Sequence, residues 1–144
     1  MHKTVITILI LFVLISTASA QKVYILGGEN RDFFLGCITC TQFHDESIWN
    51  KNGIYGTPNN DVSIWSEFSE YGNEFSNYSP WNEFATKPPA LYDDEGNFYG
   101  YFTRNVYYKE RTEDRFFIYV LDNHRWILKN FDEYVNGLYF GEQK

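Results

Sequence analysis

Two cysteines and a histidine are the first residues whose spacing suggests chemistry. Cys37 and Cys40 form a Cys-x-x-Cys motif, and His44 follows four residues later. Outside the cytosol the expected state of such a pair is a disulfide, whereas inside it redox or metal chemistry would be expected. A regular strand would hold the two residues about 10 Å apart, so a disulfide requires a turn at residues 38–39. The alternatives are inert thiols, thiol redox catalysis, or a zinc site that adds His44 and takes Asp45 or His124 as its fourth ligand.

Acidic side chains gather in two short runs, Asp45-Glu46 and Asp93-Asp94-Glu95. A glycoside hydrolase needs two carboxylates held at a fixed separation across a cleft, so a hydrolase is one candidate. A solvated hairpin turn explains residues 93–95 more simply, because Gly96 and Asn97 follow directly. The chain has no Gly-x-Ser-x-Gly, no His-Glu-x-x-His and no glycine-rich phosphate loop. We therefore expect no catalytic residues and no cofactor.

Aromatic residues form the most regular pattern in the chain. Phe, Trp and Tyr make up 20% of it, and a Ser-x-Trp triplet recurs at residues 47–49, 63–65 and 79–81. This constant step of 16 predicts three repeats, each opening with a helical turn capped by its serine. Exposed Trp and Tyr rings suit sugars or protein partners because they offer a large area at low entropic cost. The candidate binding residues are Tyr55, Tyr71, Tyr78, Trp49, Trp65 and Trp81. The other interpretation is burial, which we favour for the tryptophans, while the tyrosines are expected to be half exposed.

Residues 1–20 have the composition of an export signal. A short cationic start precedes an almost wholly apolar run from Val5 to Ile15, and Ala18-Ser19-Ala20 is a small-x-small cleavage site. The apolar run is too short to span a membrane, and no later run is long enough. Cleavage after Ala20 predicts a secreted or periplasmic protein of residues 21–144. Loss of Lys3 lowers Lys+Arg from 12 to 11 against 19 Asp+Glu, and the resulting net charge of −8 disfavours nucleic acids and anionic lipids as partners.

Two similar β-hairpins are predicted on either side of the repeats. Residues 21–44 and 88–108 each contain an apolar strand, a turn rich in Gly, Asn or Asp, and a return strand. Their return strands match at an offset of 64, four times the repeat length. We expect the hairpins to pair into one small sheet that carries residues 47–87 as a long insert.

The tail, residues 115–140, is predicted to be partly helical. Residues 115–121 are apolar enough for a buried strand or the start of a helix. After Asp122 or Asn123, apolar residues recur at nearly helical spacing, and Gly137 lies where that helix should end. The mature chain is thus expected to be one small α+β domain, mainly β, with two hairpins, three aromatic repeats and a C-terminal helix.

Several motifs resemble those of a group of uncharacterised exported bacterial proteins. The matching runs are Phe34-Leu35-Gly36-Cys37, Ser-Ile-Trp-Asn with Tyr-Gly, Ser-Pro-Trp-Asn, Pro-Pro and Gly-Asn-Phe-Tyr-Gly, over about residues 30–108. That group is similar in carrying tandem repeats of the form S-I-W-N-x-Y-G-x-Y-G-S-x-Y-S. The resemblance implies an exported bacterial protein and brings no activity and no catalytic residue. This chain departs from the form at Asn52 and over residues 56–60, so the first repeat is expected to be looser than the others.

These patterns together favour a non-catalytic exported module that binds an envelope glycan or protein through surface aromatics. An envelope enzyme is one alternative, acting through thiol redox chemistry at Cys37 and Cys40 or through paired carboxylates. An interbacterial effector or its immunity protein is another, and the repeats would then serve only as a scaffold.

Overall fold

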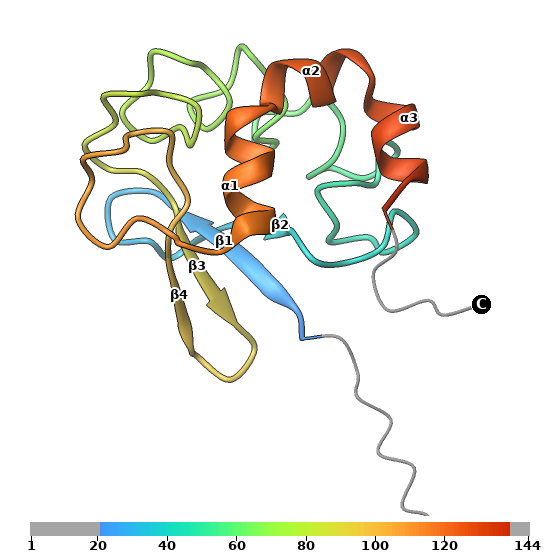
Figure 1. Cartoon of the computed structure of the whole chain (residues 1–144). Helices are drawn as coiled ribbons and strands as arrows, with labels where there is room; N and C mark the ends of the chain where they lie inside the picture. The colour runs from blue at the N-terminus through green and yellow to red at the C-terminus, as the bar shows by residue number, and fades with distance from the viewer. Residues whose placement is uncertain (1–20, 139–144) are drawn as a thin grey trace, which may run out of the picture.

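Four strands and three short helices form the regular part of this small α+β fold (Figure 1). The computed structural model describes residues 21–138, so the predicted export signal and the end of the predicted tail lie outside the described residues. The strands are β1 (Val23–Gly27), β2 (Phe33–Cys37), β3 (Ala90–Asp93) and β4 (Phe98–Tyr101). The helices are α1 (Arg115–Asp122), α2 (His124–Lys129) and α3 (Phe131–Asn136).

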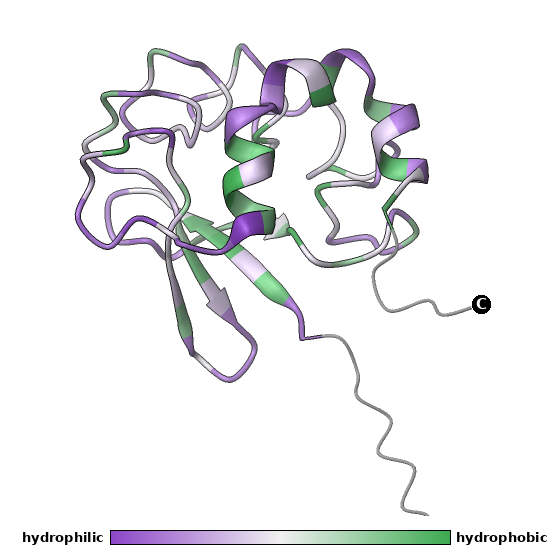
Figure 2. Cartoon of the chain, in the orientation of Figure 1, coloured by the Kyte–Doolittle hydropathy of each residue, from purple (hydrophilic) through white to green (hydrophobic). Residues whose placement is uncertain are grey.

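The strands form a single antiparallel sheet in the order β2-β1-β3-β4. Each predicted hairpin supplies two neighbouring strands, and β1 pairs with β3 in the centre, with Val23 opposite Asp93 and Leu26 opposite Ala90. The expectation that both hairpins join one sheet is therefore confirmed. Alternate residues of β1 are buried, as expected for a strand with one face on the core (Figure 2).

The two hairpins also leave the sheet in the same way. Gly36 and Gly100, 64 residues apart, both have positive φ angles, 113° and 91°. The residue after each glycine then forms a parallel bridge, Cys37 to Ser47 in one hairpin and Tyr101 to Arg111 in the other. Each glycine is required because a Cβ atom would approach a neighbouring backbone carbonyl to 3.0 Å at Gly36 and 2.9 Å at Gly100.

Residues 38–89, here called the loop segment, contain no helix or strand. Their backbone folds into successive three-residue turns, in which an N–H donates to the carbonyl three positions earlier. Ser47, Ser63 and Ser79 each accept the N–H of the Trp two positions later, at 3.0, 3.2 and 3.1 Å. The predicted helical turns are therefore wrong, because these backbone bonds recur at every third residue rather than at every residue.

The three tryptophans form a ladder in the core. The ring centroids of Trp49 and Trp65 lie 5.6 Å apart, and those of Trp65 and Trp81 lie 5.3 Å apart. Each indole N–H donates to a backbone carbonyl in an earlier pass of the chain, which satisfies the polar tip of a buried ring. The acceptors are Ile38 for Trp49, Ile48 for Trp65 and Ile64 for Trp81, at 2.7, 2.7 and 2.6 Å.

The helices pack against this ladder. Trp49 meets rings from α1 and α3, among them Phe116 and Phe131, and Trp81 is stacked on His124 at the start of α2. In α1, Phe117, Val120 and Leu121 are buried, and the ribbon of this helix is largely hydrophobic in colour (Figure 2). The core therefore joins the sheet, the loop segment and the helices into one cluster.

The tail departs from its prediction in two places. Residues 115–122, left open between strand and helix, form α1, because Asp114 caps it by accepting the N–H groups of Phe116 and Phe117. The single helix expected after residue 122 is two helices, α2 and α3, separated by Asn130. Across residues 21–138, none of the helices is long and apolar enough to cross a membrane.

Candidate functional site

The tryptophans proposed for ligand binding are core residues. Trp49, Trp65 and Trp81 are only 1%, 2% and 2% exposed. Their faces are also occupied, because the ladder continues from Trp81 to the parallel ring of His124, with centroids 4.5 Å apart. A sugar or a protein side chain therefore cannot stack on them, and their assignment to the binding surface is corrected.

The tyrosines proposed with them are half-buried and lie against the first hairpin. Tyr71 stacks on Phe33 at 5.1 Å, and Tyr55 meets Phe34 edge-on at 5.1 Å. The hydroxyl of Tyr78 donates to Glu29 at 2.9 Å. These three side chains thus hold the loop segment against β2 and the turn before it, and leave only part of each ring available to a ligand.

The Cys-x-x-Cys motif forms a buried disulfide. Cys37 and Cys40 are bonded, with Cα atoms 5.5 Å apart, so the chain turns between them as a disulfide requires. The bond leaves no thiolate for the zinc site considered with His44. The Nδ1 atom of His44 instead accepts the Glu46 N–H at 3.1 Å. Within residues 21–138, no three His, Cys, Asp or Glu side chains cluster as metal ligands.

The acidic run at residues 93–95 has a structural role. The Asp93 carboxylate accepts the N–H groups of Glu95 and Asn97, both at 2.9 Å, and also binds the Tyr99 hydroxyl at 3.0 Å. These bonds hold the β3-β4 turn and favour the charged form, so the Asp93 pKa is lowered although burial opposes the shift. The carboxylate is fully engaged in the turn and is not aimed into a cleft.

An extended concave surface lies between the loop segment and helices α2 and α3. Four hollows follow one another there, with volumes of about 430, 370, 460 and 380 Å³. Neighbouring hollows share lining residues, so they adjoin one another in a row, here called the seam groove. The first and second hollows share Lys51, Phe131 and Asp132. The second and third share Leu128 and Lys129, and the third and fourth share Glu74, Trp81 and Arg125.

Equivalent positions of the loop segment line successive parts of the groove. Lys51, Gly56 and Pro58 line the second hollow, and the residues 16 positions later line the third. The two end hollows are related in the same way at a step of 32: Phe43 and Trp49 line one, and Phe75 and Trp81 line the other. The spacing in the sequence is thus reproduced as spacing along the groove.

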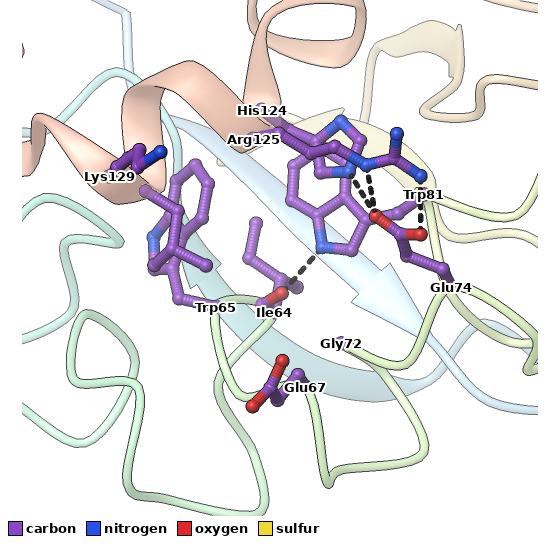
Figure 3. Close-up of a pocket in the computed structure, with 10 residues that line it drawn as sticks. Ile64, Trp65, Glu67, Gly72, Glu74, Trp81, His124, Arg125 and Lys129 are labelled. Carbon is purple, nitrogen blue, oxygen red and sulfur yellow. Dashed lines mark hydrogen bonds and ion pairs between the residues drawn. The ribbon is translucent and has the colours of Figure 1, made fainter.

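A three-residue charged cluster joins the two walls of the groove (Figure 3). Glu74, from the loop segment, receives two bonds from Arg125 of α2, at 2.7 and 2.6 Å. Its Oε1 atom also lies 3.1 Å from Nε2 of His124. The Arg125 hydrogen bonds are the main reason that the Glu74 pKa falls to about 2, so this carboxylate stays charged throughout the physiological range.

His124 is the buried member of this cluster. Its Nδ1 atom lies 3.2 Å from the Leu121 carbonyl and its Nε2 atom faces Glu74, so both ring nitrogens meet an acceptor. Burial against Trp81 penalises the charged ring and lowers the His124 pKa, and the positive charge of Arg104 acts in the same direction. The neutral ring donates to one acceptor only. His124 therefore packs between Trp81 and α2, with each ring nitrogen next to an oxygen of another residue.

Phenylalanine rings project into solvent beside the groove. Phe75 and Phe84 line the fourth hollow and are 90% and 80% exposed. Phe43, beside the first hollow, and Phe68 are also strongly exposed. Fully exposed large rings are unfavourable in a monomer and are common where a partner binds.

The sequence contained a signal for these rings, but we did not assign it. Phe68 and Phe84 each stand three residues after a ladder Trp, at equivalent positions of the 16-residue step. The Trp is buried and the Phe three residues later is exposed. Glu74 and His124 carried no such signal, since they lie 50 residues apart and only the folded chain brings them together.

The seam groove is lined by charged side chains and aromatic rings. The described residues that line its four hollows include no Ser, Thr or Cys nucleophile. Its deepest carboxylate, Glu74, has a lowered pKa, the opposite of the raised pKa that a general acid needs. Comparison of the chain with protein-family models, curated proteins and solved structures finds no match.

Proposed function

We propose that this chain is an exported, non-catalytic binding module that holds an extended polymer of the cell envelope along the seam groove. The observation that carries the proposal is the continuity of four hollows beside the exposed rings of Phe75 and Phe84. A small molecule would need one enclosed pocket, whereas an open groove suits a ligand longer than any single hollow. The composition of residues 1–20 supports the export part of the proposal.

We also propose that the loop segment arose from copies of one 16-residue unit, and the hairpins from copies of another. The support is the recurrence of the same bonds: a Ser hydroxyl to the Trp N–H, and an indole N–H to a carbonyl of an earlier pass. A module built in this way presents the same groups at a constant step, which suits a ligand that is itself periodic.

The enzyme alternatives have less support. The disulfide sulfurs of Cys37 and Cys40 are buried, and thiol exchange requires access to one of them. Three of the groove carboxylates, those of Asp132, Glu83 and Glu74, are engaged in ion pairs with Lys51, Arg104 and Arg125. A hydrolytic pair would need one protonated and one free carboxylate across a cleft.

Removal of the exposed rings beside the groove tests the proposal. The chain 21–144 with Phe75→Ser and Phe84→Ser should bind its polymer at least about tenfold more weakly, because anchor rings carry much of the energy of an interface. Binding is measured by biolayer interferometry against immobilised envelope polysaccharides and unstructured polypeptides. Thermal unfolding should be nearly unchanged, since both rings are already in water.

Tyr107→Ser is the matched control. Tyr107 is 93% exposed and is not among the groove residues, so the substitution removes an equally exposed ring from another part of the surface. Binding should be retained in this variant. If the double variant binds every polymer as tightly as the Tyr107 variant does, the seam groove is not the binding surface.

A further inference from the structure

We infer that the occupant of the seam groove is an uncharged glycan whose successive sugar rings meet successive turns of the loop segment. The inference rests on the proposed function and names the class of polymer. Three features carry it: the pairing of the charges in the groove, the step of the tryptophan ladder beneath it, and two polar side chains on opposite walls of its third hollow.

Most charges of the groove are already neutralised by each other. Lys51 pairs with Asp132 at 2.9 Å, Arg125 with Glu74 at 2.6 Å, and Arg104 with Glu83 at 2.9 Å. A charged ligand would have to compete with these pairs. A sugar hydroxyl does not, because it can donate to a paired carboxylate and accept from a paired cation at the same time.

The distance between successive passes of the loop segment, measured at the ladder rings, matches the repeat of a glycan better than that of a polypeptide. Successive ladder rings are 5.6 and 5.3 Å apart, and the loop positions that line the groove follow the same order. In an extended polypeptide, side chains on one side recur about every 6.6 Å. After two steps, such a side chain would lie about 2 Å beyond the corresponding ladder ring. The repeat length of an extended glycan is the length of one sugar ring with its linking oxygen. This length is close to the distance between successive ladder rings.

Glu67 and Lys129 supply free polar groups at the centre of the groove. They line the hollow of about 460 Å³ from opposite walls, Glu67 on the loop segment and Lys129 at the end of α2 (Figure 3). Neither side chain forms a hydrogen bond or an ion pair with another residue in the range 21–138. An acceptor and a donor that line one hollow from two different elements can bind the hydroxyl or acetamido groups of a sugar.

The test is a length series of uncharged oligosaccharides. β-1,4-linked N-acetylglucosamine oligomers and β-1,4-linked glucose oligomers are titrated into chain 21–144 by isothermal calorimetry. For at least one series, affinity should rise with each added ring until the turns of the loop segment are covered, and then level off. Glucosamine oligomers, which are cationic, and uronic acid oligomers, which are anionic, should bind at least tenfold more weakly than neutral oligomers of equal length.

Two double variants link this binding to the groove. Glu67→Gln with Lys129→Gln should weaken binding of the neutral oligomer by about tenfold, through the loss of charge-assisted hydrogen bonds. Glu70→Gln with Lys109→Gln is the matched control, since both residues are exposed and neither lines the groove. This control should bind as the unaltered chain does, and all variants should show the same thermal unfolding.

The outcomes separate the inference from the proposed function. Equal affinity for neutral and charged glycans, an affinity independent of length, or equal effects of the two double variants would overturn the inference. Binding of unstructured polypeptides alone, lost with the Phe75 and Phe84 substitutions, would also overturn it but would keep the proposed function. Absence of binding to every glycan and polypeptide would remove both.

Discussion

Gly72 shows how tightly each pass of the loop segment is closed. A Cβ atom at this position would lie 2.0 Å from the Ser66 carbonyl oxygen, and Gly56, 16 residues earlier, has the same relation to Asn50. The obstructing atoms belong to the backbone, so no side-chain rotation can relieve the clash. The Tyr-Gly pair that recurs in the sequence is therefore explained by a close approach of two chain segments rather than by the end of a helix.

Gly72→Ala is expected to destabilise the protein by about 3 kcal/mol or more, because the loop must open to admit a methyl group. Urea unfolding followed by tryptophan fluorescence measures the change, since the ladder rings lie in the same segment. Gly137→Ala is the control: its new methyl group would meet its nearest neighbour at an ordinary distance of 3.4 Å. A Gly72 variant as stable as the Gly137 variant would contradict this account of the turns.

For several residues the sequence predicted the hydrogen bond but not the backbone conformation around it. Serine was expected to accept a nearby backbone N–H, and Ser47, Ser63 and Ser79 do so. A helix and a chain of three-residue turns both begin with that bond, and only the following backbone bonds distinguish them. The serines were thus given the right hydrogen bond, while the shape of the segment that they open was not predicted.

At the scale of elements, the hairpins were predictable and the helix boundaries were not. The hairpins have alternating apolar residues and Gly-rich turns, which are strong local signals. The break between the last two helices depends on Asn130, whose side-chain amide donates to the Trp126 carbonyl at 2.9 Å. Asn123 makes the same bond to Tyr119 where α1 ends. In each case the backbone N–H of the same asparagine also donates to that carbonyl, so one residue closes the last turn twice, and apolar periodicity does not reveal it.

The disulfide is an element-scale feature, since it closes the turn directly after β2. The other hairpin has Tyr101 and Arg104 at the positions 64 residues after the cysteines, and it keeps the same parallel bridge. Replacement of Cys37 and Cys40 by Ser should therefore leave the fold intact, at a cost of about 2 kcal/mol for a loop this short. Urea unfolding of the double variant measures this cost.

Ligand binding distinguishes a structural disulfide from a catalytic one. A binding module with both cysteines replaced should keep its affinity for the polymer, and reductant should no longer change its unfolding midpoint. Loss of an oxidoreductase activity in the double variant, with stability unchanged, would instead assign the pair to thiol redox chemistry.

At the scale of the whole molecule, the groove exists only because distant segments meet. Its walls come from the loop segment and from α2 and α3, so its lining residues are separated by up to about ninety positions in the sequence. The sequence predicted a domain with one sheet and aromatic repeats, but no local pattern shows which loop face the helices will cover. The groove and its charged cluster therefore could not be predicted from the sequence. The exposed phenylalanines could have been, because they recur at equivalent positions.

The Glu74-His124-Arg125 cluster ties the helices to the loop segment, so the stability of the whole fold should depend on pH in two stages. The pKa of folded His124 is below its ordinary value of 6.5, so the unfolded chain binds the proton more tightly and stability falls as the pH drops below about 6.5. The pKa of folded Glu74 is about 2 instead of 4.5, so its contribution is complete above pH 4.5 and is lost as the pH falls toward 2.

Glu74→Gln should reduce the dependence of the free energy of unfolding on pH between about pH 4.5 and pH 2. Urea unfolding at a series of pH values measures that dependence. The effect is expected to be on the order of 1 kcal/mol, because the carboxylate is about one-third exposed and solvent screens its pairing. Lys51→Gln breaks the more exposed pair with Asp132 and serves as the control, with little change at any pH. If Glu74→Gln and Lys51→Gln give the same pH profile, the cluster does not hold the two walls of the groove together, and the acid sensitivity of the protein must come from other carboxylates.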